Sequence, residues 1–259
     1  MKILYYIDSH DSRVNGIVET IKAAGYTVGY LTELDQKSIY EFNPDIIIHN
    51  IPNAEKFPID GDFISINFNE SKSKNSFTFA DESSDRYISP FVSLKEIHVD
   101  KKDLDKYRSD VLYFGSPYSF NECLNIIYEK KIKFRFFHHT PHNIYGYCGM
   151  CNTDEYFKHY RYAKASIVNG LNDRARLQDI IVAGGNPVIF LGDKDDFTSR
   201  LEKAVYEDKK YTIDGMSKRD ILNKNTAFDV SANIFKKIGL NKISKDIEQV
   251  KQKMIGKYR

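Results

Sequence analysis

The chain has 259 residues, of which 41% are hydrophobic and 29% charged, and its formal net charge is +2. With 14 glycines, 7 prolines and 3 cysteines, the composition is too balanced for a disordered, collagen-like or disulfide-stapled protein. The length allows one large domain or two small ones. No apolar run approaches the roughly 20 residues that span a bilayer, so we expect a cytoplasmic protein.

Strands and helices alternate in the first hundred residues. Strands are predicted at 1–7, 27–31, 45–49, 63–68 and 76–79, with helices at 14–24 and 35–42. This alternation predicts a mostly parallel sheet covered by helices on both faces. Ligands of such sheets bind beyond the carboxyl ends of the strands.

A charged stretch at 99–109 predicts a linker to a second run of the same kind. Strands are expected at 110–114, 133–137, 165–169 and 187–191, and helices at 120–130, 153–163, 174–183, 195–208 and from 218 to the end with a break at Gly239. We therefore predict an α/β protein with two Rossmann-like domains facing across a cleft. The expected ranges are 1–105 and 110–240, followed by a basic helix at 241–259.

Charge is distributed unevenly along the chain. Residues 1–108 carry 13 Lys and Arg against 18 Asp and Glu, whereas residues 209–259 carry 13 against 5. Such a basic end is typical of a surface that faces nucleic-acid phosphates, and also of the solvated face of an amphipathic helix. Charge alone favours the second interpretation.

The most informative stretch is AKASIVNGLNDRARLQDIIVAGGNPVIFLGD at 163–193. Its helix begins with Arg174 and Arg176, and Asp179 lies three residues after Arg176 on the same face. An arginine at a helix start can pair with a diphosphate, and a nearby carboxylate can accept hydrogen bonds from both hydroxyls of a ribose. The spacing therefore predicts a nucleoside diphosphate site, with a surface ion pair as the alternative.

Residues 110–200 resemble the nucleotide-sugar-binding half of the GT-B-fold glycosyltransferases. The likeness rests on YFGSPYSFNECLNIIYEKKIKFRFF, EYFKHYRYAKASIVNG and RLQDIIVAGGNPVIF in that order. Within the family, the chain is most similar to bacteriophage DNA glucosyltransferases, which modify hydroxymethylcytosine. The resemblance implies transfer of a sugar from a nucleotide diphosphate donor, such as a UDP-sugar, to an acceptor such as hydroxymethylated phage DNA in the host cytoplasm. It also implies that the first domain takes the acceptor and that the C-terminal helix crosses back onto it.

Donor contacts follow from the same resemblance. It assigns the diphosphate and ribose to Gly115, Ser116, Arg174, Arg176 and Asp179, and the base to His138. Tyr118, in a loop after a predicted strand, can stack on a base or sugar, with packing as the alternative.

Two features depart from the family. The ribose ligand is Asp179 where the family has Glu, and the loop 115–122 contains no cation. A nucleotide-binding protein without catalysis is therefore the alternative, as is a glycosyltransferase for glycans or small molecules. No tightly bound cofactor is expected, and a divalent cation beside the diphosphate stays open.

The catalytic base is assigned to Asp81. SFTFAD at 76–81 resembles a phage-enzyme strand ending in Phe-Thr-Asp, whose Asp takes the proton of the acceptor hydroxyl. From the residues alone, Asp81 follows an alternating apolar run, with Glu82 and Asp85 as rivals and a solvated loop as the alternative.

The loop after the first strand lacks both G-x-G-x-x-G and G-x-x-x-x-G-K-[ST], which removes the main support for a dehydrogenase or a kinase. We assign its His10, Asp11 and Arg13 to the acceptor side. The alternative is helix capping by Asp11 or Ser12.

HHTPHNIYGYCGMC at 138–151 contains zinc-ligand residue types, namely His138, His139, His142, Cys148 and Cys151. One C-x-x-C is only half of a site. We therefore predict a local loop there and assign no metal.

Overall fold

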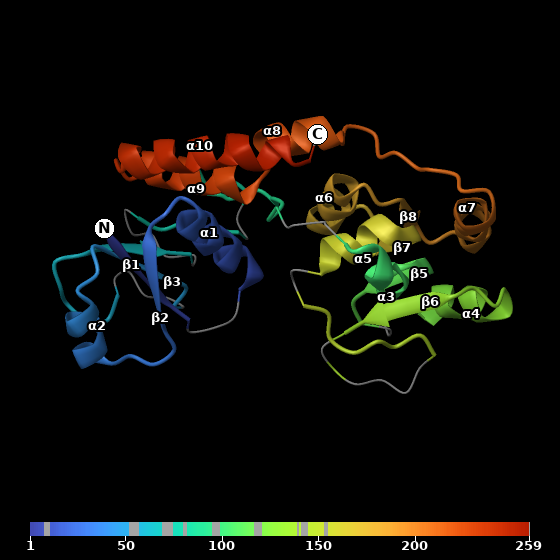
Figure 1. Cartoon of the computed structure of the whole chain (residues 1–259), viewed down its shortest axis with the longest axis horizontal. Helices are drawn as coiled ribbons and strands as arrows, with labels where there is room; N and C mark the ends of the chain where they lie inside the picture. Colours follow the sequence, from blue (N-terminus) through green and yellow to red (C-terminus); the bar gives the residue numbers. More distant parts are fainter. Residues whose placement is uncertain are drawn as a thin grey trace. The chain divides into compact units, whose positions relative to one another are not determined.

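The computed structural model describes residues 1–7, 11–51, 57–68, 75–79, 82–94, 99–116, 121–138, 140, 145–152 and 155–258. The chain forms two compact units, here called unit 1 (Met1–Ser93 with Lys224–Arg259) and unit 2 (Leu94–Asn223). Each unit contains one four-stranded sheet whose pairings are all parallel, with helices packed on it. Both units are therefore Rossmann-like, as the sequence predicts (Figure 1).

The sheet of unit 1 has the order β2-β1-β3-β4. Its strands are β1 (Lys2–Tyr6), β2 (Thr27–Leu31), β3 (Ile46–His49) and β4 (Ile64–Asn67). Every residue of β3 is buried, because the central strands of a parallel sheet are covered on both faces. Ile3 of β1 pairs with Val28 on one side and with Ile46 on the other.

The described residues of unit 1 form the helices α1 (Ser12–Ala23), α2 (Gln36–Phe42), α9 (Ala227–Lys237) and α10 (Asn241–Gly256). Helix α1 buries Val14, Ile17, Val18 and Ile21, whose spacing of three to four residues forms one apolar stripe. The hydroxyl of Thr20 on α1 donates to Ser231 on α9 at 2.6 Å. The C-terminal helices therefore pack on the N-terminal unit, in line with the crossing back that the family resemblance implies.

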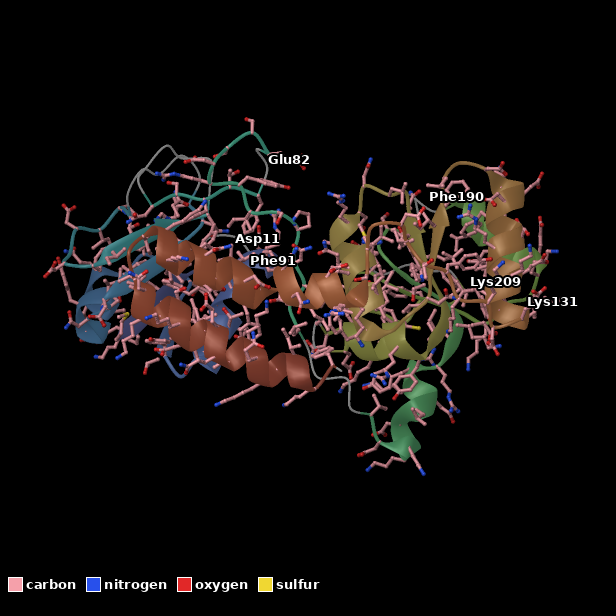
Figure 2. The ribbon with its side chains drawn as sticks, turned by 90° about the horizontal axis from the view of Figure 1, so that it is seen from above. Asp11, Glu82, Phe91, Lys131, Phe190 and Lys209 are labelled. Carbon is pink, nitrogen blue, oxygen red and sulfur yellow. The ribbon has the colours of Figure 1, made fainter. Side chains whose placement is uncertain are left out.

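The sheet of unit 2 has the order β6-β5-β7-β8, the same pattern as in unit 1. Its strands are β5 (Ser109–Phe114), β6 (Phe134–Phe137), β7 (Ala163–Asn169) and β8 (Pro187–Phe190). Its helices are η1 (Lys101–Asp103), α3 (Leu104–Tyr107), α4 (Asn121–Glu129), α5 (Tyr156–Tyr162), α6 (Arg174–Ala183), α7 (Lys194–Tyr206) and α8 (Lys218–Lys224), whose last residue falls in unit 1. Phe190 packs edge-on against Phe197 of α7, with ring centroids 5.4 Å apart (Figure 2). None of the helices in the described part of the chain is long and apolar enough to cross a membrane.

Three features differ from the sequence predictions. The predicted strand at 76–79 is wrong: Ser76 and Thr78 form only isolated bridges, to Asn67 and Tyr87. The predicted coil at 99–109 contains η1, α3 and the first residue of β5. Residues 224–240, which we expected in the second domain, belong to unit 1 because α9 packs on α1. The ranges of the units therefore differ from the expected domain ranges.

Candidate functional site

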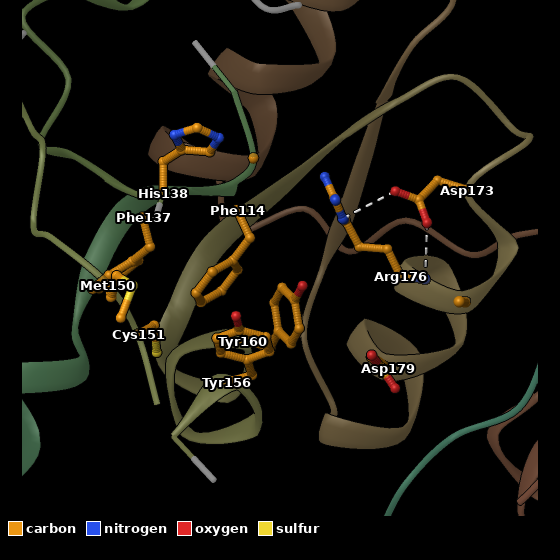
Figure 3. Close-up of a pocket in the computed structure, with 12 residues that line it drawn as sticks. Phe114, Phe137, His138, Met150, Cys151, Tyr156, Tyr160, Asp173, Arg176 and Asp179 are labelled. Atoms are coloured by element: carbon orange, nitrogen blue, oxygen red, sulfur yellow. Dashed lines mark hydrogen bonds and ion pairs between the residues drawn. The ribbon is translucent and has the colours of Figure 1, made fainter. Parts of the chain in front are cut away.

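A pocket of about 370 Å³ opens at the carboxyl ends of β5 and β6 in unit 2 (Figure 3). In an open parallel sheet, such a position beside the reversal of strand order is where ligands bind. Here the order reverses between β5 and β7. The pocket is lined by Phe114, Gly115, Phe137, His138, Met150, Cys151, Tyr156, Tyr160, Asp173, Ala175, Arg176 and Asp179.

Gly115 ends β5 at the pocket wall with φ of 145°, in the region that favours glycine. A Cβ added there would lie 2.8 Å from the hydroxyl oxygen of Tyr113. The positive φ therefore favours glycine here, and a larger residue would also have to displace the Tyr113 hydroxyl.

The N-terminus of α6 forms the polar side of the pocket. Asp173 caps this helix by accepting a hydrogen bond from the backbone N–H of Arg176 at 3.2 Å. Its other carboxylate oxygen lies 3.1 Å from Nε of Arg176 (Figure 3). The first backbone N–H groups of a helix carry partial positive charge, which favours an anion at this end.

Arg176 is held between this carboxylate and aromatic rings. Its side chain is 25% exposed, and its guanidinium lies 5.7 Å from the ring centroid of Tyr113. Burial works against the charged form, but nearby Tyr160, Asp173 and Tyr113 outweigh it and raise the pKa of Arg176. The pocket therefore holds one permanently positive side chain among its lining residues.

Aromatic rings form the apolar side. Phe114 stacks on Phe137 with centroids 5.0 Å apart, and Tyr156 and Tyr160 of α5 lie 4.4 Å and 5.1 Å from the Phe114 ring. Burial raises the pKa of Tyr156 and of Tyr160, so both phenols are neutral. Neither tyrosine was predicted as a site residue, although their spacing of four residues places them on one face of a helix.

The residues predicted to contact the donor differ in where they lie. Gly115, His138, Arg176 and Asp179 all line the pocket. Of the other described residues, Ser116 follows Gly115 outside the lining set. Arg174 is exposed and also lies outside that set. Tyr118 lies outside the described residues.

On the acceptor side, the structure shows the capping alternative for Asp11. Asp11 caps α1 through the backbone N–H of Arg13 at 2.8 Å, and its carboxylate pairs with the Arg13 guanidinium at 2.7 Å. Burial alone would raise the pKa of Asp11, but hydrogen bonds and charge from Arg13 lower it. The Arg13 guanidinium lies 4.1 Å from the ring centroid of Phe79, which itself packs against Phe91. His10 lies outside the described residues.

The residue assigned as catalytic base, Asp81, also lies outside the described part of the chain. Its rivals are described. Glu82 is exposed and accepts a hydrogen bond from the hydroxyl of Tyr87 at 3.2 Å. Asp85 is exposed, and its backbone oxygen accepts a hydrogen bond from Lys237 of α9 at 2.6 Å. Both rivals are therefore accessible to solvent.

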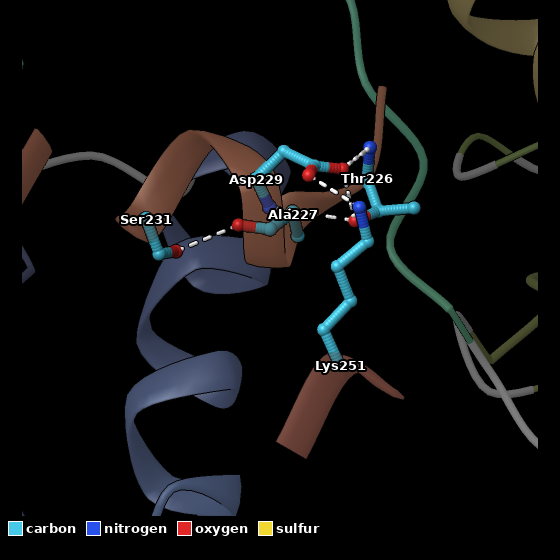
Figure 4. A network of polar contacts seen from close by, with 5 residues as sticks. All are labelled: Thr226, Ala227, Asp229, Ser231 and Lys251. Carbon is cyan, nitrogen blue, oxygen red and sulfur yellow. Dashed lines mark hydrogen bonds and ion pairs between the residues drawn. The ribbon is translucent and has the colours of Figure 1, made fainter. Parts of the chain in front are cut away.

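The C-terminal helix is amphipathic, with some of its basic charge turned inward. Lys251 is only 6% exposed, and its Nζ donates to the carboxylate of Asp229 (Figure 4). That carboxylate also accepts from the backbone N–H of Thr226 at 3.0 Å and completes a capping box at the start of α9. Four other lysines of this segment are exposed: Lys242, Lys245, Lys253 and Lys257.

No protein-family profile matches the chain. No curated protein sequence matches it. Among solved structures, it is similar to AviGT4, a glycosyltransferase involved in avilamycin A biosynthesis, with a TM-score of 0.46 and 11% identity over 99% of this chain and 98% of that one. It is also similar to the spinosyn forosaminyltransferase SpnP, with a TM-score of 0.36 and 9% identity over 99% and 95% of the two chains. A D-2-hydroxyisocaproate dehydrogenase follows, with a TM-score of 0.23 and 13% identity over 79% and 76%.

Proposed function

We propose that unit 2 binds the diphosphate and ribose of a nucleotide sugar, and that the chain is a glycosyltransferase of GT-B type. One observation carries the proposal: Arg176 and Asp179 line the same pocket as the N-terminus of α6, at the carboxyl end of a parallel sheet. An arginine and free backbone N–H groups suit a diphosphate, whereas a carboxylate suits ribose hydroxyls.

The apolar side of the pocket suits the base. Stacking on aromatic faces stabilises a base by about 1–3 kcal/mol, and Phe114, Tyr156 and His138 lie on that side. The donor we propose is a UDP-sugar. The acceptor oxygen would bond to the anomeric carbon of the sugar while the bond from that carbon to the outer phosphate oxygen breaks, and UDP would leave. Arg176 would stabilise the negative charge that develops on the leaving UDP.

Transfer also needs a base for the acceptor hydroxyl, and we keep Asp81 in this role. The Asp81→Asn variant retains size and hydrogen bonding but cannot take a proton. We expect it to bind UDP as the natural chain does and to lose sugar transfer. Full transfer activity would move the role to Glu82 or Asp85, whose Gln and Asn variants complete the series.

Hydroxymethylated DNA is the acceptor we propose first, because exposed lysines of α10 can contact phosphates. DNA binding should then weaken with salt, with a log–log slope of about −0.9 per phosphate contacted. Replacing Lys242, Lys245 and Lys253 together by Gln should reduce that slope. Absent or salt-insensitive binding would favour a glycan or a small molecule as acceptor.

A nucleotide-binding protein without turnover is the second candidate, favoured by the single permanent cation among the described lining residues. Calorimetry with UDP, GDP and ADP, with and without Mg²⁺, tests the site, and release of UDP from UDP-glucose tests catalysis. Arg176→Ala should remove most UDP binding, since a hydrogen bond to a charged group contributes about 1.5–3 kcal/mol. Arg174→Ala is the matched control, because Arg174 is exposed outside the lining set. Unchanged UDP affinity in Arg176→Ala would overturn the site.

A further inference from the structure

Three side chains with metal-binding atoms converge beside the pocket in unit 2. Cys151, Glu155 and His159 each offer one ligand atom, and these atoms all lie within 4.8 Å of one another. Cys151 also lines the pocket, whereas His159 is only 2% exposed. The cluster therefore reaches from the buried face of α5 to the pocket wall.

Local structure explains the convergence. Glu155 precedes α5, and its backbone oxygen accepts a hydrogen bond from the His159 N–H at 3.1 Å. A separation of four residues places both side chains on one face of the helix. Cys151 lies before α5, outside the helix, and its sulfur also falls within 4.8 Å of the ligand atoms of Glu155 and His159.

One nitrogen of the buried His159 imidazole lacks a partner. Nδ1 is fully buried and has no hydrogen-bond partner among the described residues, although burial of an unsatisfied polar atom is costly. Around the ring pack Tyr107 and Phe137, with centroids 4.9 Å and 4.6 Å away. Imidazole nitrogens are among the commonest metal ligands in proteins.

Among the described residues, hydrogen bonds reach only one oxygen of the Glu155 carboxylate. Lys106 Nζ at 2.5 Å and the Tyr107 hydroxyl at 2.9 Å both donate to its Oε1. The second oxygen, Oε2, can therefore bind a cation while these contacts remain. The positive charge of Lys106 next to the cluster weakens the binding of a divalent cation. Without a metal, this ammonium is the positive partner of the Glu155 carboxylate.

We infer that Cys151, Glu155 and His159 form a binding site for Zn²⁺, with the fourth position left to water or a pocket ligand. Zinc takes thiolate, imidazole and carboxylate ligands at about 2.0–2.3 Å, so ligand atoms of a tetrahedral site lie roughly 3.5 Å apart. Atoms within 4.8 Å need only a small closure. Binding replaces the proton of the Cys151 thiol, which is released to solvent. Zinc binding at this cluster does not depend on whether unit 2 binds a nucleotide sugar.

Titration of the reduced full chain with Co²⁺, followed by displacement with Zn²⁺, tests this site. We expect one Co²⁺ per chain, a thiolate-to-metal charge-transfer band and the intense visible bands of a four-coordinate ion. Cys151→Ser should abolish the charge-transfer band, and Glu155→Gln should weaken Zn²⁺ binding at least tenfold. Lys106→Gln should tighten it, because the competing charge is removed.

The matched control is Cys148→Ser, the other free cysteine of the C-x-x-C, which lies outside the cluster. It should leave the charge-transfer band and the Zn²⁺ affinity unchanged. The Zn²⁺ affinity of His159→Gln is compared only if its circular dichroism spectrum matches that of the natural chain. The variants of the partly exposed Cys151 and Glu155 decide the test without it. The zinc site would be overturned if the charge-transfer band survived in Cys151→Ser. It would also be overturned if Cys148→Ser and Cys151→Ser lost Zn²⁺ affinity equally while Glu155→Gln lost none.

Discussion

Asp173 holds Arg176 twice: one carboxylate oxygen accepts from the Arg176 backbone N–H at 3.2 Å, and the other lies 3.1 Å from its Nε. The first contact caps α6, and the second neutralises the cation that faces the pocket. A diphosphate must therefore compete with a fixed carboxylate for Arg176.

Asp173→Asn separates these two contacts, because Asn still caps a helix but carries no charge. We expect UDP to bind about two- to fivefold more tightly in calorimetry, since a partly exposed ion pair contributes up to about 1 kcal/mol. Asp173→Ala is the control, and it should also lose about 1 kcal/mol of stability with the cap. Weaker UDP binding in Asp173→Asn at unchanged stability would show that the carboxylate instead orients Arg176 for the ligand.

We expect Asp179 to accept hydrogen bonds from the ribose hydroxyls. Asp179→Ala should weaken UDP binding roughly 10- to 100-fold, because hydrogen bonds to a charged acceptor are lost. The natural chain should also bind UDP more tightly than its 2′,3′-dideoxy analogue, and the variant should bind both equally. If the preference for UDP persisted in Asp179→Ala, the hydroxyls would be recognised elsewhere.

The regular elements could be predicted from the sequence because their signals are local. Residues 27–31 form a strand and 174–183 a helix, as the apolar pattern and the bounding glycines predict. The failure at 76–79 is different. SFTF alternates like a strand, but Ser76 and Thr78 find only single bridging partners, and pairing depends on neighbours distant in sequence.

The closeness of Arg176 and Asp179 could be predicted because one helix carries both, whereas their role as donor ligands stays a prediction. Arg176 and Asp179 share a turn of α6, so their spacing alone places them together. The zinc-ligand types of 138–151 form only half of a site, and we predicted a local loop without metal there, whereas Cys151 lies with Glu155 and His159 of the following segment. That grouping depends on the orientation of α5 against the loop, which a linear pattern does not contain.

Lys251 and Asp229 form a largely buried ion pair, and its loss should lower the free energy of unfolding. Asp229→Ala removes a carboxylate that pairs with a buried ammonium and also removes the capping box, so we expect a loss of about 3–5 kcal/mol in urea unfolding followed by circular dichroism. Lys251→Met should cost less, since Asp229 keeps its cap contacts and is partly exposed. Lys253→Met, on an exposed position of the same helix, is the control. Equal losses for Lys251→Met and Lys253→Met would contradict a stabilising pair.

His49 gives unit 1 a defined dependence on acid. The ring is fully buried at the end of β3, and its Nε2 lies 2.8 Å from the Ser65 hydroxyl. Its Nδ1 has no hydrogen-bond partner in the described part of the chain. Burial lowers the pKa of His49 from 6.5 to about 4. A lowered folded-state pKa means that the unfolded chain binds the proton first. The stability contributed by neutral His49 is therefore full above pH 6.5 and falls as the pH drops towards 4.

We test this with His49→Gln, which keeps a polar atom for Ser65 but does not titrate. The free energy of unfolding of the natural chain should exceed that of the variant at pH 8, and the difference should shrink by about 2 kcal/mol at pH 5. Ile47→Val, in the same buried strand, is the matched control: its deficit should be the same at both pH values because no proton is involved. A His49→Gln deficit that does not change between pH 8 and pH 5 would mean that the imidazole is protonated without cost in the folded chain.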